Sequence, residues 1–516
     1  MKKLLIHIFL LSSLAFISCS GSRKNALEKK DNGKIEIVFV QVNDVYEIAP
    51  LEDGKVGGMA RVATLKKQYA VKNPNTFLLM AGDFLSPSVY NSLKYEGKRI
   101  RGKQMVEAMN VAGMDMAIFG NHEFDISESE LQDRINESKF KWVASNSFHK
   151  KGTVVTAFVK TNSEGTNKLP ENVIMAITDA DGTTANIGFI GLTLPFNKAS
   201  YVDYADPFFM ADTLYNRMKD ICDAVVAITH QSMEDDIALA KRLPGLAAII
   251  GGHEHDMRFQ KVGEVYITKA HANARSAYIV KLQINKRKQQ LKVKPKLQMI
   301  DASIALDPAT DAVVQKWTDI ANKNYASLGF DATKVVMQNG VPLDGRETQV
   351  RSETTNFTKM IVSGMQAAAP LADVAIINAG AIRVDDMLQA PVTQYDIIRS
   401  LPFGGGITEV DMKGSLLIKV LTTGMKNKGI GGFLHYNSDV VYNTDAKQWF
   451  LKGQAIDATK NYHVAMLDFL ITGGEANMDY LTPKNPDVVK MYPVITDATD
   501  PRSDVRLAII RHMEKL

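Results

Sequence analysis

Several apolar runs in this chain end at a side chain that can bind a metal ion. The runs VFVQV, TFLLMAG, MAIFG, VVAIT and AAIIGG are typical of strands that are covered on both faces. Because open α/β sheets place their sites beyond the carboxyl ends of the strands, we expect these side chains to converge. The residues are Asp44, Asp83, Asn121, His122, His230, His253 and His255.

A single histidine of this kind is usually a buried core residue, since a neutral imidazole packs well once it is hydrogen-bonded. Five separate strand ends that carry only Asp, Asn and His are much harder to explain by core packing. Oxygen and imidazole ligands without a thiolate suit Mn, Zn, Fe, Co or Ni better than a soft metal. The pattern therefore predicts a metal site.

The chain is long enough, at 516 residues, for two or three domains. Between 35 and 304 the apolar runs alternate with helical patterns such as GGMARVATLKKQYA, which predicts an α/β domain with helices on each side. The segment DPATDAVVQKWTDIANKNYASL has helical spacing and predicts a connecting helix within 305–330. Residues 331–516 have strands and helices of their own, which predicts a second, smaller α/β domain.

The first nineteen residues have the features of an export signal. MKK precedes LLIHIFLLSSLAFI, an apolar stretch too short for a comfortable transmembrane helix. Ser18 before Cys19 is similar to a bacterial lipoprotein signal, in which the cysteine becomes the lipidated first residue and anchors the chain to a membrane. Simple cleavage and release is the alternative. Residues 20–34 are polar and aperiodic, as in a tether, so we expect a periplasmic or cell-surface protein.

Charge and cysteine content exclude little else. The formal net charge of +4 is small for this length and does not indicate a nucleic-acid polymer as partner. Cys222 is the one cysteine after the signal, so no internal disulfide is expected. The sequence leaves the oligomeric state open.

The order of the motifs, D…GD…GNHE…H…GHxH, resembles the signature of calcineurin-like metallophosphoesterases. GNHEFD with the preceding GKQMVEAMNVAGMDMAIF is similar in particular to the 5′-nucleotidase family, from about residue 36 to the end. The resemblance implies a four-layer-type α/β metallophosphoesterase domain at 35–304 and a C-terminal substrate-binding domain at 331–516. It also implies two divalent metal ions, with Mn, Zn, Co and Fe as candidates.

The resemblance implies metal-binding roles residue by residue. Asp83 would bridge the two ions, since a carboxylate offers two oxygens. Asn121, His230 and His253 would complete the first ion.

Asp44 and His255 would hold the second ion, together with a histidine that the family has two residues after the aspartate. That position is Tyr46 here. Three hypotheses stay open: the phenol ligates as phenolate and favours a harder metal such as ferric iron, it packs away and water fills the position, or catalysis is lost and nucleotide binding remains. Every other ligand is present, so loss of catalysis ranks last.

His122 follows a ligand directly but matches a family position that does not bind metal. With Asp125, three residues on, it resembles a dyad that stabilises the transition state and assists the leaving ester oxygen. The carboxylate would orient the imidazole and favour its charged form. The alternative is that His122 only caps the turn.

The resemblance also implies a substrate-binding set in the second domain, namely Arg351, Asn378, Arg383, Phe403, Phe469 and Glu475. NAGAIR at 378–383 is similar to the family's NGGGIR, whose asparagine contacts the base and whose arginine contacts the phosphate. The two phenylalanines match aromatics that stack on both faces of the base. Glu475 replaces an aspartate that holds the ribose hydroxyls, which puts sugar recognition in doubt. Surface arginines and core phenylalanines are the alternatives.

The expected function is release of phosphate from nucleoside 5′-monophosphates through attack by metal-bound hydroxide, for nucleotide salvage. A 2′,3′-cyclic-nucleotide phosphodiesterase or a UDP-sugar hydrolase could use the same residues. A non-catalytic nucleotide-binding lipoprotein is the alternative from another class. A hydrolase of a non-nucleotide phosphoester or sulfur ester is a further one.

Overall fold

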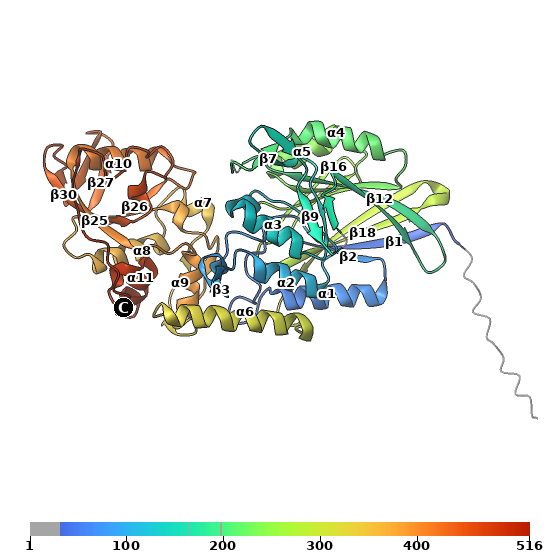
Figure 1. The fold of residues 1–516 in the computed structure, drawn as a ribbon, viewed down its shortest axis with the longest axis horizontal. Helices are drawn as coiled ribbons and strands as arrows, with labels where there is room; N and C mark the ends of the chain where they lie inside the picture. The colour runs from blue at the N-terminus through green and yellow to red at the C-terminus, as the bar shows by residue number, and fades with distance from the viewer. Residues whose placement is uncertain (1–30, 164, 197–198) are drawn as a thin grey trace, which may run out of the picture.

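The structure is a computed structural model that describes residues 31–163, 165–196 and 199–516. The predicted signal peptide, with Cys19, and most of the predicted tether lie outside the described residues. An N-terminal lobe and a smaller C-terminal lobe follow each other along the chain (Figure 1). Within the described ranges, the helices are all too short or too polar to span a membrane.

The N-terminal lobe is built on two six-stranded sheets. In the first sheet, two antiparallel strands lie on one side of four parallel strands, in the order β19 (Gln290–Met299), β18 (Ser276–Asn285), β1 (Lys34–Val42), β2 (Thr76–Met80), β5 (Met116–Ile118) and β6 (Lys141–Val143). The second sheet has four parallel strands at its centre, in the order β11 (Asn172–Thr178), β12 (Thr184–Thr193), β14 (Ala224–His230), β15 (Ala248–Gly251), β17 (Val265–Lys269) and β16 (Arg258–Val262).

The two sheets pack face to face. Phe39 of β1 and Phe189 of β12 meet edge to face with their ring centroids 5.6 Å apart. One buried apolar cluster joins side chains of both sheets. Each sheet therefore covers the inner face of the other, and the continuous apolar runs follow from burial on both faces.

Helices cover the outer face of each sheet. Apolar side chains of α1 (Met59–Lys72), α2 (Lys103–Ala112) and α3 (Glu128–Glu137) share a core cluster with the first sheet, and those of α4 (Pro207–Met218) and α5 (Met233–Arg242) do so with the second. This arrangement confirms the predicted four-layer α/β fold. The sequence predicted helices on each side of a sheet, but the inner face of each sheet packs against the other sheet. Each sheet therefore has helices on its outer face only.

Helix α6 (Pro308–Ser327) lies where a connecting helix was predicted, and it packs against α1 and α2. Asp307 caps its first turn and Pro308 opens it, both of which favour a helix start. Trp317 is fully buried and donates from Nε1 to Glu107 Oε2 at 2.9 Å. The helix is thus part of the N-terminal lobe's outer layer.

The C-terminal lobe contains a five-stranded mixed sheet, in the order β26 (Leu434–Tyr436), β22 (Val374–Asn378), β30 (Asn461–Leu467), β25 (Ile407–Lys413) and β31 (Val488–Met491). Alternate residues of β22 face opposite clusters, with Val374 and Ile376 against α10 (Gly414–Lys426) and Ile377 against α8 (Asn356–Ala368) and α11 (Val505–Met513). Two short helices, α7 (Glu347–Val350) and α9 (Gln394–Ser400), lie toward the N-terminal lobe (Figure 1).

The remaining strands form small sheets and hairpins at the edges of the lobes. In the N-terminal lobe they are β3 (Lys94–Tyr95), β4 (Lys98–Arg99), β7 (Ser147–Lys151), β8 (Val154–Thr156), β9 (Val159–Asn162), β10 (Gly165–Lys168) and β13 (Val202–Tyr204). In the C-terminal lobe they are β20 (Val335–Met337), β21 (Leu343–Asp344), β23 (Met387–Leu388), β24 (Val392–Thr393), β27 (Val440–Asn443), β28 (Gln448–Leu451) and β29 (Gln454–Ala455).

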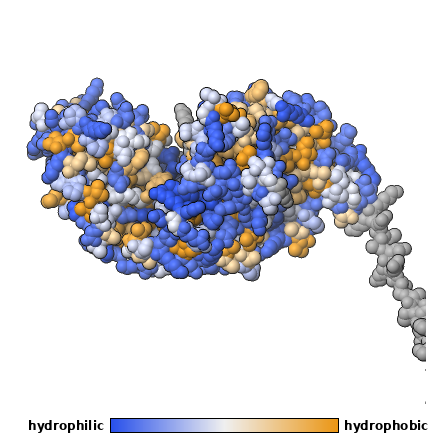
Figure 2. Space-filling model, viewed as in Figure 1, coloured by the Kyte–Doolittle hydropathy of each residue, from blue (hydrophilic) through white to orange (hydrophobic). Residues whose placement is uncertain are grey.

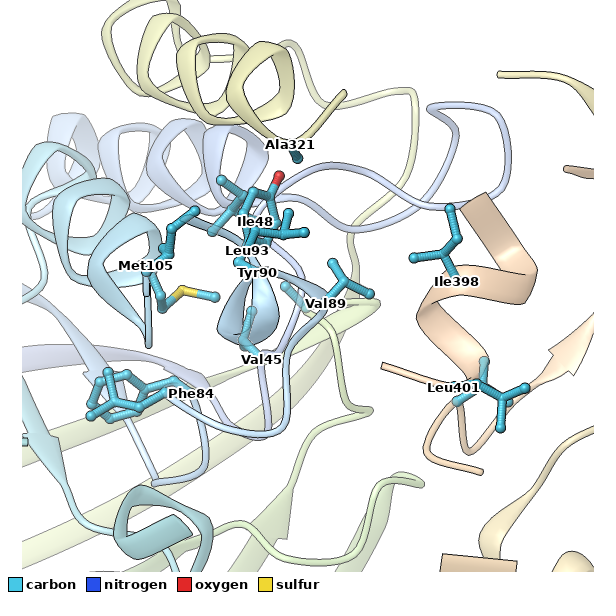
Figure 3. Close-up of a cluster of buried hydrophobic side chains, with 14 of the residues drawn as sticks. Val45, Ile48, Phe84, Val89, Tyr90, Leu93, Met105, Ala321, Ile398 and Leu401 are labelled. Carbon is cyan, nitrogen blue, oxygen red and sulfur yellow. The ribbon is translucent and has the colours of Figure 1, made fainter. Parts of the chain in front are cut away.

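An apolar contact joins the two lobes. Figure 3 shows Ile398 and Leu401, at the end of α9, beside Val89 of the N-terminal lobe, and all three are buried in one continuous cluster. The outer surface, by contrast, mixes apolar and hydrophilic residues over both lobes (Figure 2). The apolar contact between the lobes is therefore local, and it continues the core cluster of the N-terminal lobe.

Candidate metal centre and substrate site

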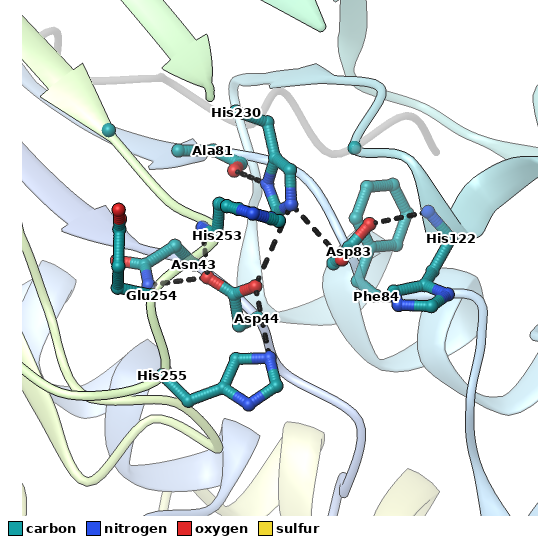
Figure 4. Close-up of polar contacts among 12 residues, drawn as sticks. Asn43, Asp44, Ala81, Asp83, Phe84, His122, His230, His253, Glu254 and His255 are labelled. Carbon is teal, nitrogen blue, oxygen red and sulfur yellow. Dashed lines mark hydrogen bonds and ion pairs between the residues drawn. The ribbon is translucent and has the colours of Figure 1, made fainter. Parts of the chain in front are cut away.

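The predicted metal-binding residues lie beyond the carboxyl ends of parallel strands in both sheets. In the first sheet, β1, β2 and β5 are each followed by one of them. In the second sheet, β14 ends in one and β15 is followed by two. Figure 4 shows residues from the two sheets turned toward each other. The residues are Asp44, Asp83, Asn121, His230, His253 and His255.

Asp44, Asp83 and His230 form the buried centre of this group. Nε2 of His230 lies 3.0 Å from Asp83 Oδ2 and 3.8 Å from Asp44 Oδ1. Nδ1 of the same ring donates to the carbonyl oxygen of Ala81 at 2.8 Å. Because this bond places the proton of a neutral ring on Nδ1, the lone pair of Nε2 is left for a cation.

One buried atom at this site has no partner among the described residues. Asn121 Oδ1 accepts no hydrogen bond there, and His230 Nε2 has only the ion-pair contacts with Asp83 Oδ2 at 3.0 Å and Asp44 Oδ1 at 3.8 Å. Leaving such an atom unpaired costs about 1–3 kcal/mol. Burial is the main cause that lowers the pKa of His253 to about 3, so its imidazole is neutral and can bind a metal. Carboxylate, amide and imidazole donors together fit divalent cations, and this cluster is a candidate metal centre.

The backbone brings these ligands together at a conformational cost. Asp44, Asp83 and His253 have φ angles of 52°, 55° and 90°, in the left-handed region that non-glycine residues rarely adopt. Gly120 allows the closest approach, because a Cβ at this position would lie 2.1 Å from Asp83 Oδ1. Strain of this kind is typical of functional sites.

Glu123 holds the Asp83 loop in place and was missed at the sequence level. Its buried carboxylate accepts hydrogen bonds from the backbone N–H groups of Asp83, Phe84, Leu85 and Gly120, at 2.5–3.0 Å. Its place inside GNHEFD was the available signal. Four N–H donors fix the loop so that the side chain of Asp83 points toward His230.

His122 and Asp125 form the predicted pair. Nδ1 of His122 lies 2.7 Å from Asp125 Oδ2, and the backbone N–H of His122 donates to Asp83 Oδ1 at 2.8 Å. Burial alone would lower the pKa of His122, but Asp83 and Asp125 outweigh it and raise the pKa. The imidazole is therefore oriented by one carboxylate and biased toward its charged form.

Tyr46 lies inside the metal centre. Its phenolic oxygen is 3.0 Å from His255 Nε2 and 3.4 Å from both Asp44 Oδ1 and Asp83 Oδ2. Burial raises its pKa well above 10, and the carboxylates of Asp83 and Asp44 add to that effect. The hypothesis that Tyr46 packs away from the site is wrong for this structure.

In the C-terminal lobe, Arg351 and Arg383 share one carboxylate. Arg351 Nη2 forms a short ion pair with Glu347 Oε1, and Arg383 Nη1 lies 3.7 Å from the same oxygen. Glu347 was not singled out in the sequence. In this structure its carboxylate pairs with both of the arginines that are predicted to bind phosphate.

Two of the other predicted substrate-binding residues contact each other. Asn378 Nδ2 donates to Glu475 Oε2 at 2.6 Å. The rings of Phe403 and Phe469 are 58% and 42% exposed, so neither is an ordinary core residue. The guanidinium carbon of Arg383 lies 5.7 Å from the ring centroid of Phe403, which places the predicted base and phosphate contacts side by side.

Both lobes line the site. Nδ1 of His255 forms a short hydrogen bond with Asp385 Oδ2, across the lobe boundary. A small cavity between the lobes is lined by Tyr46 on one side and by Arg383 on the other. Arg383, the arginine predicted to bind phosphate, also lies near enough to His122 to oppose the rise in its pKa.

Comparison with known proteins agrees with this architecture. Residues 37–257 match the calcineurin-like phosphoesterase family, and residues 332–482 match the 5′-nucleotidase C-terminal domain. The 5′-nucleotidase of Homo sapiens is 23% identical over 463 residues, which cover 80% of this chain and 77% of that protein. Silent protein UshA(0) of Salmonella typhimurium is 25% identical over 529 residues, which cover 90% of each.

A solved structure shares the fold over nearly the whole chain. The crystal structure of a 5′-nucleotidase precursor from Thermus thermophilus superposes with a TM-score of 0.69 at 20% identity, over 93% of this chain and 96% of that one. The phosphoesterase match lies in the N-terminal lobe, and the match to the 5′-nucleotidase C-terminal domain lies in the C-terminal lobe. The chain is therefore a hydrolase of ester bonds that belongs to the calcineurin-like phosphoesterases and carries the C-terminal domain of the 5′-nucleotidases.

Proposed function

We propose that this chain hydrolyses nucleoside 5′-monophosphates to nucleoside and inorganic phosphate. One observation carries the proposal: the cavity between the lobes is lined both by Tyr46, which lies inside the candidate metal centre, and by Arg383, which suits a phosphate. A phosphoryl group bound by Arg383 would lie beside the strand ends where the proposed metal ligands converge, and the cavity of about 20 Å³ must widen to admit it.

The proposed metal ligands are Asp44, Asp83, Asn121, His230, His253 and His255, holding two divalent cations. When bound, the two cations would polarise the phosphoryl oxygens and activate a water. The unpaired Oδ1 of Asn121 supports this assignment, and so does Nε2 of His230, which is buried and faces the carboxylates of Asp83 and Asp44.

His122 is proposed to donate a proton to the leaving oxygen of the nucleoside. Its Nδ1 is held by Asp125, so Nε2 carries the proton that the departing nucleoside oxygen needs. The raised pKa favours the charged form of the ring. The Asp125 carboxylate stabilises that charge and fixes the ring orientation.

In the C-terminal lobe, Arg351 and Arg383 are proposed to bind the phosphate and Phe403 and Phe469 to stack on the base. The exposure of Phe403 and Phe469 supports the stacking role, since an apolar ring that is open to solvent is stabilised when a base covers it. Asn378 would contact the base edge, and Glu475, which already accepts from Asn378, would sit near the sugar.

The proposed location is outside the cytoplasm, with a lipid anchor at Cys19. MKK, the apolar stretch after it and Ser18–Cys19 support export and lipidation. Hydrolysis at a cell surface or in a periplasm would release nucleosides for uptake, which fits a role in nucleotide salvage.

The test is phosphate release from 5′-AMP by the purified chain with added manganese. We expect turnover on 5′-AMP and a loss of turnover in His122→Ala, with metal content unchanged. Uridine 5′-monophosphate, 2′,3′-cyclic AMP and UDP-glucose, measured in parallel, separate the monophosphatase from the phosphodiesterase and UDP-sugar hydrolase. Binding of AMP without turnover on any of the four would replace the proposal with a nucleotide-binding protein.

A further inference from the structure

We propose that Tyr46 is itself a metal ligand, coordinating through its phenolic oxygen beside Asp44 and His255. The inference rests on the proposed function only for the presence of a cation at this site. It assigns a chemical role to the residue that stands where the family has a histidine, and it predicts a higher affinity for hard cations than a histidine there would give.

The loop after β1 holds Tyr46 in one position. The side-chain oxygen of Asn273 accepts from the backbone N–H groups of Tyr46 and Glu47, at 3.0 and 3.2 Å. The Tyr46 side chain is 93% buried, and its ring lies edge to face against the ring of His255, with centroids 5.5 Å apart. The phenolic oxygen therefore reaches the metal centre from a fixed backbone.

Three donor atoms, the Tyr46 oxygen, His255 Nε2 and Asp44 Oδ1, are spaced as neighbouring corners of one coordination polyhedron. The Tyr46 oxygen lies 3.0 Å from His255 Nε2 and 3.4 Å from Asp44 Oδ1, and His255 Nε2 lies 3.6 Å from Asp44 Oδ1. A cation about 2.0–2.2 Å from nitrogen and oxygen ligands separates adjacent donors by about 2.8–3.6 Å in tetrahedral or octahedral geometry. All three distances fall in that range, and Asp83 Oδ2 lies 3.4 Å from the Tyr46 oxygen.

Hydrogen bonding alone does not account for the arrangement. A phenol has one proton, and the Tyr46 oxygen has three polar neighbours, of which two are carboxylate oxygens. The proton can serve one carboxylate oxygen, and His255 can donate to the phenolic oxygen, but the second carboxylate oxygen then faces the phenol at 3.4 Å with no proton between them. A cation between the Tyr46 oxygen, Asp44 and His255 satisfies these donors together.

Coordination by Tyr46 changes the charge of the ligand set. The phenolic proton leaves to solvent when the cation binds, as it does for other protic ligands. Asp44, Asp83 and Tyr46 then supply three negative charges, where a histidine in place of Tyr46 would leave two. A third anionic oxygen favours a harder, more highly charged cation, of which ferric iron is the one with a visible signature.

The test is the visible absorption of the full chain loaded with ferric iron, because phenolate bound to ferric iron gives a charge-transfer band. Tyr46→Phe removes only the phenolic oxygen. Tyr278→Phe is the matched control, since Tyr278 is a buried tyrosine of β18 whose ring packs against Phe259. We expect the band in the unchanged chain and in Tyr278→Phe, and its loss in Tyr46→Phe.

Zinc affinity gives a second readout that needs neither colour nor activity. Tyr46→Phe should weaken zinc binding by at least about tenfold, the lower end of the loss seen when a ligand's outer-shell partner is removed. The inference is overturned if the iron-loaded chain shows no band. It is also overturned if Tyr46→Phe keeps both the band and the zinc affinity of the unchanged chain. A chain with the band that releases no phosphate from 5′-AMP keeps this inference and loses the proposed function.

Discussion

His255 of the N-terminal lobe and Asp385 of the C-terminal lobe share a hydrogen bond between Nδ1 and a carboxylate oxygen. Nε2 of His255, which is proposed to bind a metal, is thus oriented by a residue from the other lobe. A carboxylate behind a ligating histidine fixes its tautomer and raises its basicity. Asp385 is therefore a positioning residue that couples the docking of the lobes to the metal centre.

Asp385→Asn should weaken metal binding at this position by about 10–100-fold, because the amide cannot replace the carboxylate as acceptor for Nδ1–H with equal strength. Competition with a chelator measures the effect. Asp439→Asn, which changes an exposed carboxylate of the same lobe, is the control and should leave the affinity unchanged. An equal affinity in both variants would mean that the lobes do not communicate through His255.

His122→Asn should lower kcat for 5′-AMP by about 10²–10⁴-fold, the range that general acid–base groups contribute. Metal content and KM should stay near those of the unchanged chain, since the side chain of His122 is not among the proposed ligands. Steady-state kinetics with elemental analysis separate the two effects. A variant that loses its metal together with its activity would assign His122 to the metal centre instead.

Glu347→Gln should lower KM for nucleoside monophosphates by on the order of tenfold, which corresponds to about 1.4 kcal/mol. The carboxylate of Glu347 competes with the substrate phosphate for Arg351 and Arg383, and the amide does so less well. The backbone N–H of Glu347, which donates to Asp385, is retained in the variant. An unchanged KM would show that the arginines leave Glu347 at no cost when substrate binds.

Lys269→Met should destabilise the N-terminal lobe by about 3–5 kcal/mol, because it leaves buried carboxylates without their cation. Nζ of the fully buried Lys269 lies 2.9 Å from Asp236 Oδ2 and 2.5 Å from Glu254 Oε2. Urea unfolding measures the loss. Lys261→Met removes an exposed pair with Glu264, at 3.2 Å, and should cost no more than about 1 kcal/mol.

The C-terminal lobe should lose stability as the pH rises above about 6.5, the ordinary pKa of histidine. His463 Nδ1 lies 2.7 Å from Asp411 Oδ1, and Nε2 lies 2.8 Å from Glu409 Oε2. Burial alone would lower the pKa of His463, but these carboxylates raise it. A raised folded-state pKa adds stability that is complete below the unfolded pKa and is lost as the pH rises through the folded one.

His463→Gln should remove this part of the pH dependence. Its melting temperature should lie well below that of the unchanged chain at pH 6 and close to it at pH 9, as followed by thermal unfolding. A constant difference across that range would point to packing of the ring against Tyr492, 4.7 Å away between centroids, as the source of stability.

The strand-end pattern predicted the fold and the convergence of the candidate ligands, because a parallel strand fixes where its last residue lies. Asp385 and Glu347 could not be predicted, since their roles depend on how the two lobes dock. Lys269 was missed for a related reason: the run VYITKAHA does not show that its lysine points into a buried pair. Tyr46 could be placed near the centre, but the spacing of its oxygen from three ligand atoms needed coordinates.

The six proposed ligands come from strands of both sheets, and they span the chain from Asp44 to His255. No fragment that ends before residue 255 can hold the complete set, and neither sheet can hold it alone. Metal uptake must therefore be a late step of folding, after the two sheets have closed on each other. The rate at which an unfolded chain recovers its metal should accordingly report the rate at which the two sheets pack against each other.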